Sequence, residues 1–287
     1  DPANTSRHPI YFADNAPIGG APAWGSCGVG SFADPVVMTF SGGQTVDIEL
    51  DGAGFVDWGD GTIAGVVDGT ASYDLPGDGT SRHTVRIGRI AASNSSDITR
   101  FAVTAGEGAL LSVDDFGDIG LTSLYQAFQS TDNLDSLAAL PAGVTNLRYA
   151  FRYSDGILAG VESWDVSSVR DMGGMFFNAD TFDQPINGWD VSQVDDMSGM
   201  FQSAGSFDQP LDQWADKLAN VDTRSDTDRT STTRTGFDYM FRSATAFSQS
   251  LASWCVDQFD PANTSRHPIY FADNAPIVAE PVWGTCP

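Results

Sequence analysis

The residues of this chain that could do chemistry are almost all carboxylates. The 287 residues include 38 Asp and Glu, only four of them Glu, against 14 Lys and Arg and three His. Acid–base or nucleophilic catalysis needs a reactive group and a partner base held together in one pocket. No HExxH, GxSxG, P-loop or CxxC pattern occurs, and His8 and His267 are one position of a duplicated segment counted twice. Adjacent pairs such as Asp195 and Asp196 mean little in so acidic a chain, so we expect no enzyme.

Short acidic side chains in loops can also bind a hard cation, because Ca²⁺ prefers carboxylate and carbonyl oxygens. Asp57 and Asp60 flank a predicted turn, and a polar stretch near 215–235 holds further acids, Asp222, Asp226 and Asp228. Against a metal site, Asp60 followed by glycine is also what a hairpin turn requires. No EF-hand or nonapeptide motif is present. Calcium is therefore a candidate ligand, and no other cofactor is expected.

The overall charge narrows the classes of partner. A formal net charge of −24 would repel nucleic acid. The apolar fraction of 41% is enough to bury a core, and no stretch has the length of an apolar membrane span. We therefore expect a folded acidic fragment with neither a nucleic-acid partner nor a membrane-inserted segment.

A long duplication points to tandem units. Residues 1–18, DPANTSRHPIYFADNAPI, recur unchanged at 260–277, and the offset of 259 holds loosely as far as Cys27 and Cys286. An identity of this length predicts a parent protein with units of about 259 residues. Residues 1–28 are then the C-terminal tail of a preceding unit.

The cysteines fit this arrangement. Cys255 and Cys286 fall in one unit, whereas the equivalent partner of Cys27 would lie before residue 1. We expect a Cys255–Cys286 disulfide, which would stabilise by about 3–4 kcal/mol in an oxidising compartment. Two unpaired buried thiols are the alternative. A disulfide favours a secreted or cell-surface location.

A shorter period runs through 119–254. The tryptophans from Trp164 recur every 25 residues, and the last spacing is 40 because of an insertion near 215–235. Apolar residues in one unit fall near helical spacing at Met172, Met175, Phe176, Ala179 and Phe182. Each unit therefore predicts one short strand and one short helix. Five such units must stack to bury their apolar faces, as in a solenoid.

The repeat also resembles a known family. The copies WDVSSVRDMGGMFFNADTFDQPIN from Trp164 and WDVSQVDDMSGMFQSAGSFDQPLD from Trp189 are similar to the BspA-like leucine-rich repeats of bacterial surface proteins. The resemblance implies a curved parallel-strand solenoid on an exported, cell-attached protein that acts in adhesion and in host or matrix binding. Residues 255–287 look like the family's closing segment, a disulfide-closed cap.

Residues 29–118 predict a separate β unit. Alternating stretches at 46–50 and 83–87 are separated by Gly and Asp turns. The segment VDWGDGT at 56–62 resembles the signature turn of PKD-type β-sandwich modules, with its Trp anchored in the core. The whole chain is therefore expected to be mixed α/β. A short parallel-strand leucine-rich-repeat solenoid, with a strand and a short helix per repeat, follows a small antiparallel β-sandwich-like domain.

If Met172 faces the core, its neighbours face outward on the strand ladder. The outward positions of the five units supply the candidate ligand-binding residues Tyr125, Arg148, Asp171, Asp196, Ser198 and Asp238. Such a row suits a peptide, a protein surface or a glycan on another cell or matrix. Two functions remain open at this point. The chain is either the ligand-binding module of a tandem-repeat adhesin or a spacer unit of its stalk.

Overall fold

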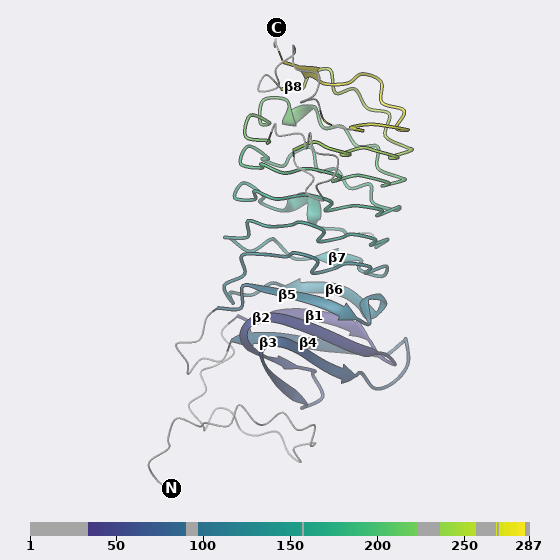
Figure 1. Cartoon of the computed structure of the whole chain (residues 1–287). Coiled ribbons are helices and arrows are strands. Elements are labelled where there is room, and N and C mark those ends of the chain that lie inside the picture. The colour runs from purple at the N-terminus through teal and green to yellow at the C-terminus, as the bar shows by residue number, and fades with distance from the viewer. Residues whose placement is uncertain are drawn as a thin grey trace, which may run out of the picture.

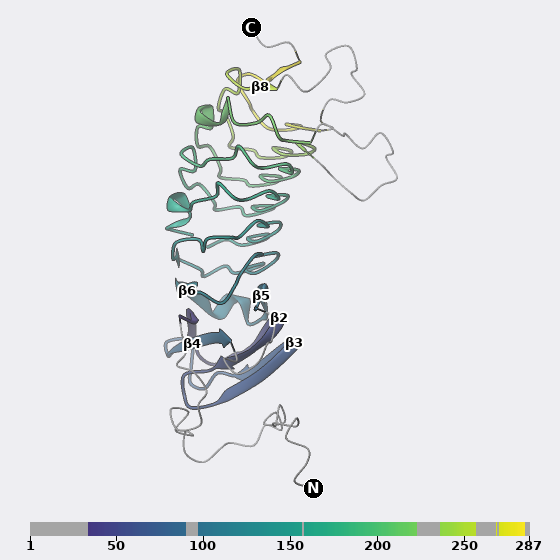
Figure 2. The same ribbon diagram turned by 90° about the vertical axis from the view of Figure 1, so that its left-hand side faces the viewer.

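A computed structural model describes residues 34–89, 97–156, 158–222, 236–256, 268 and 270–284. The protein is mostly β, with an antiparallel sheet at one end and a column of stacked coils rising from it (Figure 1, Figure 2). The helical elements of the described residues are short 3-10 turns, η2 (Glu107–Ala109), η3 (Val161–Ser163) and η4 (Asp212–Trp214). No helix in this part of the chain is long and apolar enough to cross a bilayer.

The N-terminal sheet confirms the strands expected from alternation. Its members are β1 (Val36–Ser41), β2 (Thr45–Asp57), β3 (Ile63–Asp74), β4 (Arg82–Arg89), β5 (Arg100–Ala105), β6 (Leu110–Asp115) and β7 (Ser136–Leu137). They pair in the order β3-β2-β4-β1-β6-β7, and β5 pairs with β2. The expected two-sheet sandwich is wrong, because all seven strands join one sheet. The long strand β2 connects the parts of this sheet, because it pairs with β3, β4 and β5.

The turn after β2 has a structural role. The backbone N–H of Trp58 donates to the carbonyl of Thr62 at 3.0 Å, which closes the hairpin. The Trp58 ring is buried and stacks on Tyr73 at 5.4 Å between centroids. This agrees with the structural reading of the DWGDGT segment, in which the Trp anchors the turn.

The sheet continues into the coil stack without a break. Arg100 of β5 bridges Ser123 in parallel, and one residue of each following coil extends the row. We number the coils by these bridging residues, which are Ser123, Asn146, Asp171, Asp196 and Gly236 for coils 1 to 5. A last coil, 270–283, closes the column, and its β9 (Val282–Trp283) pairs with β8 (Cys255–Val256). The predicted stacking of 25-residue units is therefore observed as a parallel ladder.

The short helix predicted in each unit is wrong. Two consecutive turns take its place, and their third residues have a positive φ, as type II turns require. The first row of such residues has φ of 51–61° and comprises Gln126, Tyr149, Gly174, Gly199, Tyr239 and Tyr270. The second row has φ of 56–64° and comprises Ser130, Tyr153, Asn178, Ser203, Ser243 and Asn274.

The hydrogen bonds explain why a helix cannot form there. The N–H of Phe176 donates to the carbonyl of Met200 in the next coil at 3.0 Å, and the N–H of Asn178 donates to Gln202 at 2.8 Å. A helix would direct these groups to carbonyls four residues back in the same segment. Two turns in succession also return to one side every three or four residues, so their apolar spacing imitates a helix.

Phenylalanine rings form the centre of the column. The rings of Phe128, Phe151, Phe176, Phe201 and Phe241 stack from coil to coil at 5.4–5.8 Å. A second row, Phe182, Phe207 and Phe247, stacks beside it at 5.7 Å. The Met, Phe and Trp positions of the repeat are therefore core, as expected. Trp164 and Trp189 also donate their indole N–H to carbonyls of the preceding coil.

Candidate functional site

The predicted ligand residues lie along the ladder, and the structure brings three of them into contact. Nη1 of Arg148, from coil 2, donates to Oδ2 of Asp196 in coil 4 at 2.7 Å. The same nitrogen lies 3.6 Å from Oδ1 of Asp171 in the intervening coil. The three side chains are only 22%, 14% and 29% exposed, in the order Arg148, Asp196, Asp171. They form one half-buried ionic cluster that ties coils 2, 3 and 4 together.

Two glycines of coil 3 make room for this cluster. A Cβ on Gly173 would lie 2.5 Å from Nη1 of Arg148, and one on Gly174 would collide with the ring of Tyr149. Gly174 also has a φ of 60°, which glycine adopts without a steric cost. Because Gly173 and Gly174 have no side chains, the Arg148 and Tyr149 side chains can pack directly against the backbone of coil 3.

The carboxylates of the cluster have perturbed acidities. Burial raises the pKa of Asp171 to about 6, and the neighbouring Asp196 carboxylate adds to the rise. The Gly173 N–H and Arg148 act in the opposite direction without cancelling it. Burial likewise raises the pKa of Asp196 although it accepts hydrogen bonds from the Ser198 amide and Arg148. One guanidinium thus faces two carboxylates, and the cluster has an excess negative charge at neutral pH.

We expect the Asp171→Asn variant to be more stable than the wild type at pH 7 by about 1–3 kcal/mol. The raised pKa means that folded Asp171 holds its proton more firmly than in the unfolded chain. Stability is therefore lost as pH rises from about 4 to about 6. In the wild type, Oδ1 of Asp171 accepts a hydrogen bond from the Gly173 N–H at 2.8 Å. Asparagine removes the charge and keeps an oxygen that can accept this bond.

Urea unfolding at pH 4 and pH 7 measures this difference, which should vanish at the lower pH. Asp190→Asn is the matched control, because Asp190 is exposed and caps its own turn through the Ser192 N–H. A variant of Asp171 that is less stable than the wild type at both pH values would contradict the prediction.

Other predicted ligand residues are less accessible than expected. Ser198 and Asp238 are only 3% and 1% exposed, so the expectation that they face outward is wrong. Their position is the second residue of the first turn, where neighbouring coils pack over it. Tyr125 is half-buried beside Arg100, whose guanidinium carbon lies 5.6 Å from its ring centroid. That any of these residues binds a ligand stays a prediction.

An adjacent cluster of arginine and aromatic rings was not predicted. The guanidinium carbon of Arg152 lies 5.3 Å from the ring centroid of Tyr149, 4.5 Å from that of Tyr153 and 5.4 Å from that of Phe177. Tyr153 and Phe177 meet edge to face at 5.5 Å. Tyr125 extends the row, with its ring 6.3 Å from Tyr149. We call these five residues of coils 1 to 3 the aromatic strip.

Apart from Tyr125, the sequence does not predict the strip, because a short helix in each unit would scatter these side chains around the helix axis. A signal was nevertheless present, since Tyr149 occupies a position that is glycine in coils 3 and 4, Gly174 and Gly199. A tyrosine with φ of 56° is strained by roughly 1–2 kcal/mol. Such strain is often stored at functional sites.

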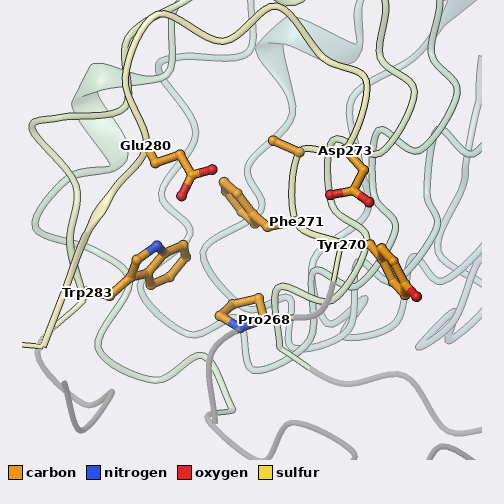
Figure 3. Close-up of a pocket in the computed structure, with 7 residues that line it drawn as sticks. Pro268, Tyr270, Phe271, Asp273, Glu280 and Trp283 are labelled. Atoms are coloured by element: carbon orange, nitrogen blue, oxygen red, sulfur yellow. The ribbon is translucent and has the colours of Figure 1, made fainter. Parts of the chain in front are cut away.

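A second group of rings lies near the C-terminal end. The guanidinium carbon of Arg242 is 5.5 Å from the Tyr239 ring centroid and 5.4 Å from that of Tyr270. Beside it is an open pocket of about 210 Å³ (Figure 3), lined by Pro268, Tyr270, Phe271, Ala272, Asp273, Glu280 and Trp283. Ligand pockets usually measure about 300–1,000 Å³. We therefore assign this smaller pocket no ligand.

The described candidate metal residues, Asp57, Asp60 and Asp222, are not part of a metal-binding group within the described residues. Asp57 accepts the Gly59 N–H at 3.0 Å, and Asp60 accepts the Thr62 N–H at 2.9 Å, as turn residues do. Across the described residues no three His, Cys, Asp or Glu side chains are grouped to hold a metal ion. Asp222 is described, but Asp226 and Asp228 lie outside the described residues, as does most of the insertion.

Many acids instead connect the coils. Asp183 accepts the Asp208 N–H at 3.0 Å, and Asp208 in turn accepts the Ser248 N–H at 2.7 Å. These short carboxylates act as acceptors for the next coil's backbone, which gives much of the Asp excess a structural reason. The expected Cys255–Cys286 disulfide lies outside the described residues, because Cys286 and the side chain of Cys255 are not among them.

Comparison with known proteins places the coil stack in a family. The family model described as "Mycoplasma protein of unknown function, DUF285" matches residues 122–231 and 230–265. These matches together span 122–265, half of the chain, and follow the coils from the first to the fifth. No curated protein and no solved structure matches the chain. The repeat motif, the ladder of coils and this match lead to one conclusion, that the chain belongs to the DUF285 family.

Proposed function

We propose that this chain is a non-enzymatic ligand-binding module of a bacterial surface adhesin built of tandem units. The ligand is an extended peptide or glycan that presents a carboxylate, and the aromatic strip receives it. One observation carries the proposal. Arg152 is surrounded by three aromatic rings and has no carboxylate partner among the described residues, in a chain with a net charge of −24.

The contrast with other arginines supports this assignment. Arg89, Arg100 and Arg148 each form an ion pair with a carboxylate. Arg152 donates through Nη2 to the Tyr153 hydroxyl at 3.0 Å, and its Nε is buried without a partner in the described part of the chain. An arginine remains charged at any physiological pH. Arg82, Arg86, Arg170 and Arg242 also form no ion pair among the described residues, but Arg152 differs from them in contacting three aromatic rings, which hold its charge ready for an external anion.

The surroundings of Arg152 suit recognition. Stacked rings hold the guanidinium in place, so little side-chain entropy is lost when a ligand binds. The planar fork can then donate two parallel hydrogen bonds to a carboxylate. Tyr153 is 38% exposed and offers a ring face beside the fork, against which a sugar or a peptide side chain can pack.

The finer assignments rest on resemblance. The coil motif is similar to BspA-like leucine-rich repeats, and the parallel ladder is the architecture that such repeats imply. An exported, cell-attached location and adhesion to a host or matrix component are what the same resemblance implies, whereas the Cys255–Cys286 disulfide is expected from the duplicated segment. The match to the DUF285 family model supports a shared repeat and says nothing of location or ligand.

We expect Arg152→Gln to weaken ligand binding by at least about tenfold, since a charged hydrogen-bonding partner contributes roughly 1.5–3 kcal/mol. Arrays of sialylated and uronic acid glycans and of peptides with acidic side chains or free C-termini identify the ligand, and titration of the best hit measures affinity. Tyr153→Ala should also weaken binding while leaving the melting temperature nearly unchanged, because Tyr153 is exposed.

Arg170→Gln is the matched control, because Arg170 is exposed and lies in coil 3 outside the strip. Equal binding by the wild type and the Arg152 variant would exclude the strip. That result would favour the alternative function, a spacer unit of the stalk. The observation that supports the spacer function is the repetition of 18 identical residues at an offset of 259. Tandem copies would then extend the protein away from the cell instead of increasing the avidity of binding.

A further inference from the structure

Each end of the described molecule exposes at least one large apolar side chain. Five large apolar side chains are exposed in the described part of the chain, and Tyr153 of the aromatic strip is one. Three others, Tyr270, Val278 and Val282, belong to the last coil and are 50%, 72% and 36% exposed. The fifth, Val67 at 51%, lies on β3. The last coil and the N-terminal sheet form opposite ends of the molecule (Figure 1, Figure 2). The terminal repeats of an isolated solenoid normally have polar outer faces.

Both ends also leave backbone groups unpaired. The 12-residue strand β3 pairs only with β2, so its outer edge has no strand partner among the described residues. In the last coil, Phe271 and Asp273 accept hydrogen bonds from Phe241 and Ser243 of coil 5. The corresponding donors one coil further, the amides of Ala272 and Asn274, have no such acceptor in the described part of the chain. Free strand edges are templates for pairing with another chain.

The length of the linker allows the complementary end of a preceding unit to reach β3. Residues 1–18 repeat 260–277, a segment that includes the first part of the last coil, and Trp24–Gly25 correspond to Trp283–Gly284. Ten residues separate Gly25 from Val36, the start of β1, and the eleven Cα–Cα steps between them span at most roughly 40 Å. In the sheet order, β3 lies three strand spacings from β1, about 15 Å. The link is therefore long enough for a preceding unit's last coil to reach β3 and short enough to hold it close.

We propose that the last coil of each unit docks on the β3 edge of the next unit, so that tandem copies form a continuous rod. The occupant of the β3 edge is a second copy of this same unit. The contact is head to tail and does not close on itself, so it propagates along the array. This inference rests on the tandem arrangement in the proposed function, but it needs no ligand.

The chemistry of the two ends sets one condition on docking. Asp68 on β3 is exposed, as are Asp273 and Glu280 in the last coil, so like charges approach one another. The attraction must come from the valines and the unpaired backbone groups. Docking should therefore strengthen as salt screens the acids.

A protein of two consecutive 259-residue units tests the proposal, because each substitution can be placed at the junction or at a free end. We expect the wild type to appear in negative-stain images as one straight rod, with small-angle scattering to match. Val67→Lys in the second unit, at the junction, should broaden the distribution of angles between units at least about twofold. The same substitution in the first unit, at the free end, should leave the rod straight. Val278→Lys should broaden the distribution of angles when it is placed in the first unit, where the last coil lies at the junction. In the second unit, where the last coil is a free end, it should have no effect.

The free-end variants also show that each substitution is tolerated by the fold. A wild-type protein whose units are already freely hinged would overturn the proposal. Equal broadening by the junction and free-end variants would overturn it too, since the contact would not involve these surfaces. Neither result tests ligand binding, because the experiment contains no ligand. Failure to find a ligand on the arrays would likewise not affect the docking proposal.

Discussion

Replacing Phe176 with alanine should lower the free energy of unfolding by about 3–5 kcal/mol, the usual cost of removing a buried ring. Phe176 is fully buried and lies 5.7 Å from the Phe151 ring of the preceding coil and 5.8 Å from the Phe201 ring of the following coil. Phe182 of the same coil stacks against it at 3.7 Å. The coils cannot collapse into the cavity, because backbone hydrogen bonds fix their spacing. Urea unfolding followed by tryptophan fluorescence measures the loss.

Phe177→Ala is the matched control one residue away. Phe177 lies in the aromatic strip and is half-buried, so its removal should cost about 1 kcal/mol. A helix could carry residues 176 and 177 on neighbouring faces, but the two turns direct one ring into the core and the other to the surface. Similar losses for the two variants would contradict this arrangement.

Composition and period were sufficient to predict the core of the coil stack. A unit of 25 residues cannot bury its own apolar face, so the repeated Met, Phe and Trp had to meet those of neighbouring units. The same reasoning gave the order of the ladder, and Asp171 and Asp196 lie in adjacent coils as expected. Stacking is a consequence of periodicity, and periodicity is visible in one sequence.

The backbone of the turns could not be predicted in the same way. The spacing of Met172, Met175 and Phe176 satisfies a helix and a pair of turns equally well. The deciding signals were Gly174 and Asn178, residue types that tolerate the left-handed conformation. In coil 2 both positions are tyrosines, which hid the pattern and with it the aromatic strip. The aromatic strip therefore lies in the coil whose residues at the two positive-φ positions differ from the Gly and Asn of coil 3.

The Arg148→Gln variant should lose about 2–4 kcal/mol of stability at pH 7.5, because it leaves two half-buried carboxylates without their cation. Asp196 would lose a hydrogen bond of 2.7 Å, and Asp171 would lose a positive charge at 3.6 Å. The pKa of each carboxyl, already raised, should rise further. Folded carboxyls with raised pKa values take up protons before the unfolded ones do, so the variant should recover stability as pH falls below about 6.

Two measurements separate this electrostatic effect from lost packing. Unfolding at pH 5 should show less than about half of the loss seen at pH 7.5, and the double variant Arg148→Gln with Asp171→Asn should regain part of it at neutral pH. Arg170→Gln makes the same charge change at an exposed site of coil 3 and should alter stability by less than about 0.5 kcal/mol. A loss independent of pH and of Asp171 would mean that Arg148 stabilises coils 2 to 4 only through its contacts with Gly173 and Tyr149. The acidic pair would then have no part in holding the stack together.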